Sequence, residues 1–374
     1  METATERSWI ELNIENLKHN VRILREAIPP ACELMAVVKA DAYGHGACAT
    51  AAVLNQMEIT AFAVATVEEG IQLRKHGIRG EILILGYTDV KRVQDLQKYD
   101  LTQTLLDFAY AQALNGRNAA VKAHIKIDTG MHRLGISSEE ISAVRKVFEM
   151  KNLKICGIYT HLCCADSRLP EDIAFTRRQI DSFYRLTDAL KNSGIQLPKL
   201  HIQSSYGFLN YPDLVCDYVR VGIALYGVSS VPDNEAVLQP ALRPVLALKS
   251  RVVLIRFIGK GDSVGYGRTF VAGRDSRIAV IPVGYGDGFP GSLSGKNVSV
   301  LINRKSVPVV GRICMDQLTV DITDAENVKV GDVVTLIGTE AEQNVAAPVV
   351  AQRADSISNE LLCRLGTRLP IVMK

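Results

Sequence analysis

The chain has 374 residues, of which 47% are hydrophobic and 22% charged, and its formal net charge is +3. This length exceeds what one hydrophobic core usually serves, so we expect one large domain and a smaller one. The charges are interspersed and form no basic stripe for nucleic acid, and no apolar run approaches the roughly 18 residues that span a bilayer. The composition therefore favours a globular enzyme whose partner is a small molecule.

The N-terminal sequence and the cysteines indicate the cellular location of the protein and whether it has a metal site or disulfides. Residues 1–7 lack the basic and apolar regions of a signal peptide. We therefore expect a cytoplasmic chain, or the cytoplasmic domain of a longer membrane-anchored protein. The eight cysteines contain no C-x-x-C pair, so we expect neither a metal site nor a disulfide framework.

The first two thirds of the chain alternate strands with helices. A strand over 9–13 is followed by an amphipathic helix that ends before Pro29. Eight apolar strand-like runs then alternate with helical stretches, at 34–40, 61–66, 81–86, 101–106, 121–128, 153–162, 199–205 and 218–225. Eight such units over this length favour a closed (β/α)8 TIM barrel over an open doubly wound sheet. No G-x-G-x-x-G follows the first strand to indicate the open sheet.

From about Arg243 the pattern changes to short strands separated by Gly and Asp turns. We predict strands at 250–257, 277–283, 298–303, 307–313 and 332–337, one helix over 347–365 and a closing strand at 370–373. The predicted fold is thus α/β, with a TIM barrel over 12–240. A mainly-β C-terminal domain is formed by 1–11 and 241–374.

Lys39 follows the first predicted barrel strand and precedes a glycine-rich turn. Burial lowers the pKa of a lysine, and a neutral amine can attack an aldehyde to form a Schiff base. The Tyr43 hydroxyl can contact an anion such as phosphate, and Gly44 and Gly46 allow close approach of the backbone to a ligand. Together these features suggest that the protein binds pyridoxal 5'-phosphate as a cofactor. The alternative is an ordinary strand-to-helix turn with a solvated lysine.

Other polar residues also lie where predicted strands end, which is where TIM barrels place their catalytic groups. Arg220 is a charge inside an apolar strand, and its alternative role is an ion pair with Asp213 or Asp217. His161 could equally be a core histidine. The remaining residues of this set are Lys126, Arg133 and Ser205.

The segment Val-Val-Lys-Ala-Asp-Ala-Tyr-Gly-His-Gly at 37–46 resembles the cofactor-lysine motif of the alanine racemase family, and the resemblance extends from residue 8 almost to the C-terminus. It implies that Lys39 binds the cofactor covalently and is one of two catalytic bases. Arg220 would donate to the pyridine nitrogen and weaken the ring as an electron sink, which favours reprotonation at Cα. His161 would pack on the ring and link Arg220 to the second base. The phosphate would be held by Tyr43, Ser205 and the backbone of Gly222 and Ile223.

The second base implied by the resemblance is Tyr266, in a turn of the β domain. In the family this tyrosine reaches the site of the other subunit, which implies a head-to-tail homodimer with shared active sites. The alternative is an aromatic side chain that caps a hairpin. Arg133 matches the arginine that binds the substrate carboxylate, and Lys126 the lysine that is often carbamylated to hold that arginine. Met315 and Tyr285 match a backbone contact to the carboxylate and a tyrosine at the entrance.

Asn359 stands where the family commonly has a tyrosine that contacts the phosphate and crowds the substrate side chain. An amide leaves room for a hydroxymethyl group and can pair with it. This resembles the membrane-anchored serine racemases of vancomycin resistance. We therefore expect a racemase for alanine and serine that supplies D-amino acids for peptidoglycan.

Three alternatives to this function stay open. One is an alanine racemase without serine activity. A second is a pyridoxal-phosphate decarboxylase of the same fold, which would need a groove for a dibasic side chain and normally a carboxylate at the pyridine nitrogen. A third is a regulatory protein that binds pyridoxal phosphate without catalysing a reaction. Such a protein would not require the β domain or Tyr266.

Overall fold

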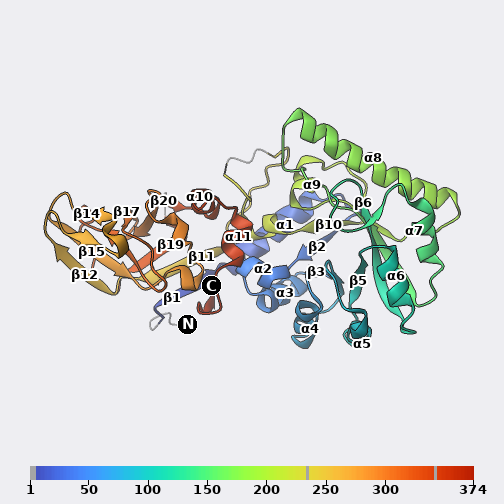
Figure 1. Cartoon of the computed structure of the whole chain (residues 1–374), viewed down its shortest axis with the longest axis horizontal. Helices are drawn as coiled ribbons and strands as arrows, with labels where there is room; N and C mark the ends of the chain where they lie inside the picture. Colours follow the sequence, from blue (N-terminus) through green and yellow to red (C-terminus); the bar gives the residue numbers. More distant parts are fainter. Residues whose placement is uncertain (1–5, 233–235, 341–342) are drawn as a thin grey trace.

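The computed structural model describes residues 6–232, 236–340 and 343–374. Its two domains lie side by side along the long axis, with the barrel at one end and the β domain at the other (Figure 1). The C-terminus lies on the β-domain side of the junction. The chain thus has the two-domain organisation that its length predicts.

Eight parallel strands of the described residues form the barrel, in the order β10-β2-β3-β4-β5-β6-β8-β9. Their bounds are β2 Glu33–Val37, β3 Ala61–Val64, β4 Glu81–Ile84, β5 Thr102–Leu105, β6 Val121–Asp128, β8 Leu153–Tyr159, β9 Lys199–His201 and β10 Tyr218–Val221. The N–H of Asp217 donates to Leu200 O (2.7 Å) and that of Arg220 to Gln203 O (3.1 Å), which joins β9 to β10. Each strand coincides with one of the eight predicted runs, with only β2 beginning one residue earlier, so the predicted barrel is confirmed.

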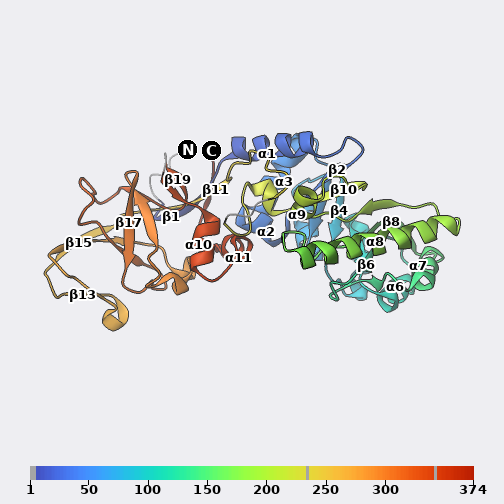
Figure 2. The ribbon, with the colours of Figure 1, turned by 90° about the horizontal axis from the view of Figure 1, so that it is seen from above.

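The helices cover the outside of the barrel (Figures 1 and 2). They are α1 Ile14–Ala27, α2 Lys39–Gly44, α3 Ala47–Gln56, α4 Val67–Lys75, α5 Val93–Lys98, α6 Phe108–Asn115, α7 Ile141–Phe148, α8 Pro170–Asn192 and α9 Ser205–Asn210. In α1 the Asn13 side chain accepts the Asn16 N–H, and Leu17, Val21 and Leu24 bury one face at helical spacing. All four residues of β3 are buried, as expected for a parallel strand covered on both faces.

The C-terminal domain is mostly β, as predicted. Its strands include β1 Ser8–Leu12, β11 Leu246–Arg251, β12 Leu254–Ile258, β15 Ser276–Ile281, β16 Ser299–Ile302, β17 Lys305–Val310, β18 Leu318–Asp321, β19 Val333–Glu340, β20 Gln343–Val345 and β21 Ile371–Met373. N-terminal β1 pairs with β11, the first strand after the barrel, and with β21 at the end of the chain. The division at residues 11 and 240 stays a prediction.

Two predicted elements of this domain are wrong in their extent. The strand expected over 250–257 is split into β11 and β12, because the chain changes partners there: β11 pairs with β1 and β19, and β12 with β15. The helix expected over 347–365 is two helices, α10 Ala347–Arg353 and α11 Ser358–Cys363. Asp355 between them has a φ of 56°, a left-handed conformation that no right-handed helix can include.

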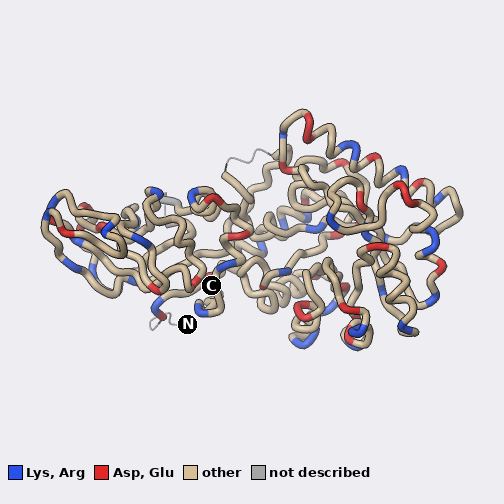
Figure 3. The backbone as a smooth tube through the Cα atoms, in the orientation of Figure 1, with Lys and Arg blue, Asp and Glu red and all other residues tan. Residues whose placement is uncertain are grey.

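Charged residues of both signs are interspersed over the two domains (Figure 3). None of the helices in the described ranges combines the length and the apolarity that a bilayer span requires.

Candidate active site

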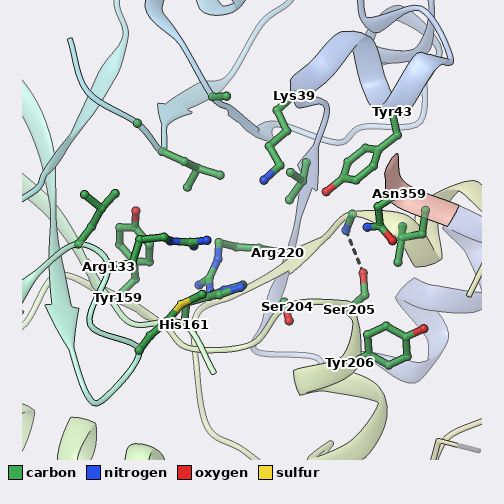
Figure 4. Close-up of a pocket in the computed structure, with 18 of the residues that line it drawn as sticks. Lys39, Tyr43, Arg133, Tyr159, His161, Ser204, Ser205, Tyr206, Arg220 and Asn359 are labelled. Carbon is green, nitrogen blue, oxygen red and sulfur yellow. Dashed lines mark hydrogen bonds between the residues drawn. The ribbon is translucent and has the colours of Figure 1, made fainter. Parts of the chain in front are cut away.

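A cavity of about 430 Å³ opens at the carboxyl ends of the barrel strands. Ten of the residues singled out in the sequence line it and come together from separate elements (Figure 4). These residues are Lys39, Tyr43, Lys126, Arg133, His161, Ser205, Arg220, Gly222, Ile223 and Asn359. Nine of them come from the ends of barrel strands and the loops that follow, whereas Asn359 comes from the C-terminal helix α11. Their individual roles stay predictions.

Lys39 begins a left-handed turn at the end of β2. Residues 40–43 all have φ between 51° and 55°, although none of them is glycine. L-residues adopt this conformation at a cost of about 1 to 2 kcal/mol each, so the turn must be held from outside. The Glu69 carboxylate accepts the Ala40 N–H (2.7 Å) and the Ala65 N–H (2.6 Å), and Asp41 Oδ1 accepts the Ala47 N–H (2.7 Å). The half-buried Lys39 side chain points into the cavity, so the reading of a solvated lysine on an ordinary turn is wrong.

The two glycines of this turn serve a purpose other than the one expected. A Cβ on Gly44 would lie 2.2 Å from the backbone oxygen of Leu362 in α11, and one on Gly46 would lie 2.9 Å from the Ile371 side chain. Their neighbours thus belong to the C-terminal domain. The expectation that they admit a ligand is wrong, because neither glycine lines the cavity. The small size of Gly44 instead lets α11 pack against α2, which places Asn359 in the cavity wall, and that of Gly46 admits the Ile371 side chain.

The cavity is lined by four cationic side chains and, among the described residues, by no carboxylate. Burial and the nearby Arg133 lower the pKa of Lys39. Burial and Arg220 lower the pKa of Lys126 to about 7, and burial lowers that of Arg220 to about 10. A site that concentrates positive charge in this way is suited to a ligand with more than one anionic group.

Arg220 is buried in β10. Its hydrogen-bond partners are nitrogen atoms and carbonyl oxygens, and its guanidinium lies 5.1 Å from the centre of the Tyr159 ring. Nη1 lies 2.9 Å from His201 Nδ1, and Nη2 donates to Thr160 O (2.8 Å) and lies 3.3 Å from His161 Nδ1. Within the described chain Arg220 has no ion pair with Asp213 or Asp217, the alternative that the sequence left open. Its charge is left to face the cavity.

A line of buried polar side chains continues from Arg220 through the barrel. His201 Nε2 lies 2.9 Å from His124 Nδ1, and His124 Nε2 lies 2.9 Å from the Glu81 carboxylate. Tyr218 donates to the other oxygen of Glu81 (2.9 Å). Burial and the positive charge of Arg220 hold the pKa of His201 well below its usual value. This line thus connects the cationic wall of the cavity to a carboxylate near the amino end of the barrel.

The opposite wall carries hydroxyl and amide groups. Ser205 Oγ accepts the N–H groups of Gly222 (3.0 Å) and Ala224 (3.4 Å), which leaves its own proton to donate. A Cβ on Gly222 would lie 2.7 Å from the Tyr43 hydroxyl, so only glycine permits this approach. Asn359 Oδ1 is buried and has no hydrogen-bond partner in the described chain. Its amide nitrogen points toward the cavity (Figure 4).

Arg133 and Lys126 come from β6 and the loop that follows it. Arg133 is largely exposed, but it lines the cavity opposite Lys39 and contributes to the lowering of that lysine's pKa. The Lys126 amine donates to Ile127 O (2.8 Å) and lies 5.7 Å from the centre of the Tyr159 ring. His161 is half-buried, and burial and Arg220 hold its pKa well below the usual value.

Three predicted site residues do not line this cavity. Tyr266, Tyr285 and Met315 lie on the β domain and are 72%, 50% and 54% exposed. The last two are neighbours, since the Tyr285 N–H donates to Cys314 O (3.1 Å) and the Gly286 N–H to Met315 O (2.8 Å). Within one chain they form a separate surface, so their predicted roles require a second subunit.

Sequence reasoning missed several residues that shape the cavity. Tyr159, Met131, Ser204 and Tyr206 line it, and Glu69, His201 and His124 orient its walls. His124 and His201 offered a signal, because polar residues inside buried strands need partners. The only sequence signal at Glu69 was a capping box with Thr66, and such a box is common at the start of a helix and does not indicate a functional site.

Comparison with known proteins places this geometry in a family. The family model described as "Alanine racemase, N-terminal domain" matches residues 12–230, and "Alanine racemase, C-terminal domain" matches 245–373. An amino-acid racemase of Enterococcus faecalis is 50% identical over 370 residues and a serine/alanine racemase of Enterococcus gallinarum 39% over 372, covering 99% and 100% of this chain. The chain spans about half the length of these two relatives, 52% in each case.

A solved structure shows the same fold over the whole chain. The alanine racemase of Bacillus anthracis with bound L-Ala-P superposes with a TM-score of 0.92 at 30% identity, covering 99% of this chain and 95% of that one. The matches to both domain models, together with this structural agreement, show that the chain belongs to the alanine racemase family.

Proposed function

We propose that the protein is a pyridoxal 5'-phosphate-dependent racemase that interconverts L- and D-alanine and L- and D-serine. The observation that carries the proposal is the cavity itself, in which four cations and no carboxylate of the described chain surround the amine of Lys39. An anionic cofactor and a substrate carboxylate supply the missing negative charge. Family membership and the names of the relatives support the same reaction.

The residues present fit the cofactor. The hydroxyls of Tyr43 and Ser205 and the backbone at Gly222 and Ile223 would hold its phosphate. Arg220 would face its ring nitrogen, and Lys39 would bind its aldehyde carbon. When bound, the cofactor withdraws electrons from the substrate Cα, so that the Cα hydrogen can leave as a proton.

Within this arrangement each side chain has a defined task. Lys39, whose pKa is lowered by burial, accepts or delivers a proton on one face of Cα. Arg220 can only donate hydrogen bonds, so it holds the ring nitrogen without a proton and limits the electron withdrawal. Limited electron withdrawal would favour return of a proton to Cα. Arg133 would bind the substrate carboxylate, and His161 would pack on the cofactor ring.

A second base must act from the opposite face of Cα, and we assign this role to Tyr266 of the partner subunit in a head-to-tail homodimer. The exposure of Tyr266, Tyr285 and Met315 on the β domain supports a surface that completes another chain's cavity. Lys126 is the proposed carbamylation site. A lysine with a pKa near 7 is partly neutral at physiological pH, and a neutral amine reacts with carbon dioxide.

Asn359 is the residue we propose for serine acceptance, since its amide nitrogen points toward the cavity (Figure 4). This amide could donate a hydrogen bond to a serine hydroxyl. The supply of D-amino acids for peptidoglycan and a cytoplasmic location stay predictions. A decarboxylase of this fold finds no support in a cavity whose described lining residues include no carboxylate.

The test is to measure racemisation of L-alanine and L-serine by the purified, cofactor-loaded protein, with L-ornithine and L-lysine as decarboxylation controls. We expect both D-alanine and D-serine to form and no carbon dioxide to be released. D-alanine without D-serine would reduce the proposal to an alanine racemase. Carbon dioxide release, or cofactor binding with no turnover of any substrate, would overturn it.

A further inference from the structure

Two thiols meet at the amino end of the barrel, at the opposite end of the strands from the cavity. Cys32 precedes β2 and Cys216 precedes β10, and their Sγ atoms are 3.4 Å apart. The backbone beside them is held in register, because the Glu33 N–H donates to Asp217 O over 2.8 Å. A disulfide bond is about 2.0 Å long, so the two sulfur atoms need to approach by only about 1.4 Å.

The environment of the pair distinguishes the two sulfur atoms. A hydrogen bond from the Cys32 thiol and the positive charge of Arg220 lower the pKa of Cys216, against the effect of burial. The same hydrogen bond and burial raise the pKa of Cys32. Cys216 is therefore the thiol that ionises first, and the thiolate is the form that reacts with oxidants.

A small oxidant has a route to the pair. A cavity of about 190 Å³ lies beside Cys32, and the exposed residues Arg25, Glu33 and Glu58 form part of its lining. Both cysteines are themselves partly exposed. A molecule the size of hydrogen peroxide can therefore reach them without opening of the barrel.

We propose that Cys32 and Cys216 are a modification site at which a peroxide forms a reversible disulfide. The Cys216 thiolate attacks one peroxide oxygen, the O–O bond breaks, and the departing hydroxide takes up a proton to become water. The Cys32 sulfur then attacks the sulfenic sulfur of Cys216, and a second water leaves with the Cys32 proton. Two thiols are oxidised to one disulfide, and one peroxide is reduced to two waters.

The disulfide would join the first and last strands of the barrel. Such a link closes a very long loop of the unfolded chain and thereby destabilises the unfolded state. It also fixes the seam at which β10 meets β2. The cavity is at the other end of these strands, so we expect oxidation to change stability and to leave the cavity open. This inference is independent of the proposed function.

The experiment treats the full, cofactor-loaded chain with one equivalent of hydrogen peroxide, alkylates the remaining thiols and maps the peptides by mass spectrometry. We expect a peptide pair linked through Cys32 and Cys216, with two fewer alkylated thiols, and its loss after treatment with dithiothreitol. The oxidised protein should melt about 3 °C or more above the reduced protein.

The chain offers a matched control. Cys163 and Cys164 are the other close pair, with their Sγ atoms 3.7 Å apart, but they are neighbours in sequence and close no long loop. The double variant Cys163→Ser/Cys164→Ser should keep the linked peptide and the rise in melting temperature, whereas Cys216→Ser and, separately, Cys32→Ala should lose both. The proposal would be overturned if peroxide modified other thiols without linking Cys32 to Cys216. It would also be overturned if the link formed and the melting temperature did not change.

Discussion

Nη1 of Arg220 donates a hydrogen bond to Nδ1 of His201 over 2.9 Å. Arginine has no acceptor, so Nδ1 of His201 carries no proton and the proton of this neutral ring is on Nε2. That proton points at Nδ1 of His124, 2.9 Å away, which must accept it, so the proton of His124 is on the nitrogen beside Glu81. The orientation of a single cation thereby sets the tautomers of two buried imidazoles.

Replacing His201 tests this relationship. His201→Phe keeps a ring but leaves a guanidinium N–H buried without its acceptor, which costs about 1 to 3 kcal/mol. We expect a corresponding loss in the free energy of unfolding and weaker cofactor binding, measured by urea denaturation and by cofactor titration.

The matched control for His201 is Tyr159→Phe. The Tyr159 ring stacks on His201, and its hydroxyl pairs with Thr104 (3.0 Å), so loss of the hydroxyl leaves the acceptors of Arg220 in place. It should cost about 1 kcal/mol and leave cofactor affinity unchanged. Equal effects of both variants, or a proton found on Nδ1 of either histidine by nitrogen NMR of the cofactor-free protein, would contradict the inferred arrangement.

Lys39→Ala should abolish covalent attachment of the cofactor and all racemisation. The protein should be yellow, and borohydride should fix the cofactor to the peptide that contains Lys39. Absorbance spectra and peptide mapping provide the measurement, and Lys126→Ala serves as a control lysine from the same cavity that should keep the attachment. Attachment to a different lysine would remove the centre of the proposed function.

Tyr266→Phe keeps the ring and removes the proton carrier, so we expect a fall in kcat of at least about 100-fold with the cofactor still bound. Mixing Lys39→Ala with Tyr266→Ala subunits should restore part of the activity, because some mixed dimers contain one intact site. Steady-state kinetics before and after subunit exchange provide the measurement. Failure to recover activity after proven exchange would argue against action across the dimer.

Asn359→Tyr tests the choice of substrate. A serine hydroxyl left without a partner costs about 1 to 3 kcal/mol, so kcat/KM for serine should fall roughly 5- to 150-fold. Alanine, with only a methyl group, should be little affected or should improve. Kinetics with both amino acids give the comparison, and an equal change for the two substrates would show that Asn359 is not the selector.

The stability of the protein should fall in mild acid because of His45. This histidine is buried against Tyr226, and burial lowers its pKa from 6.5 to about 4. Between these two values the unfolded state binds the proton and the folded state does not, so the free energy of unfolding decreases as the pH falls through this range. The slope for one such histidine is at most about 1.4 kcal/mol per pH unit.

The measurement is urea denaturation at several pH values between 7 and 4.5. His45→Phe keeps the ring contact and should reduce the slope by up to that amount, whereas His76→Asn, at an exposed position, should leave it unchanged. A wild-type slope that His45→Phe does not alter would show that another group dominates in this range.

The sequence by itself determined the barrel, because eight apolar runs separated by amphipathic helices specify parallel strands that are covered on both faces. It also predicted that nine of the residues lining the cavity lie together, since the carboxyl ends of parallel strands meet at one edge whatever the detail of the loops, whereas Asn359 reaches the cavity from α11 of the other domain. The predicted strand over 250–257 and helix over 347–365 failed for one reason. Apolar periodicity continues across a change of partner strand or a single left-handed residue such as Asp355.

Only the tertiary structure decided the rest. The purpose of Gly44 depends on α11 and that of Gly46 on β21, both more than 300 residues away in the chain, and no local pattern encodes these contacts. Glu69 holds the strained turn after Lys39 by accepting the Ala40 N–H. His201 and His124 form a line of polar contacts between Arg220 and Glu81. Both sets of contacts arise only when the barrel closes. Residue types along the chain specify which chemical groups are available, whereas distances and burial, which set pKa values and partners, exist only once distant segments have packed together.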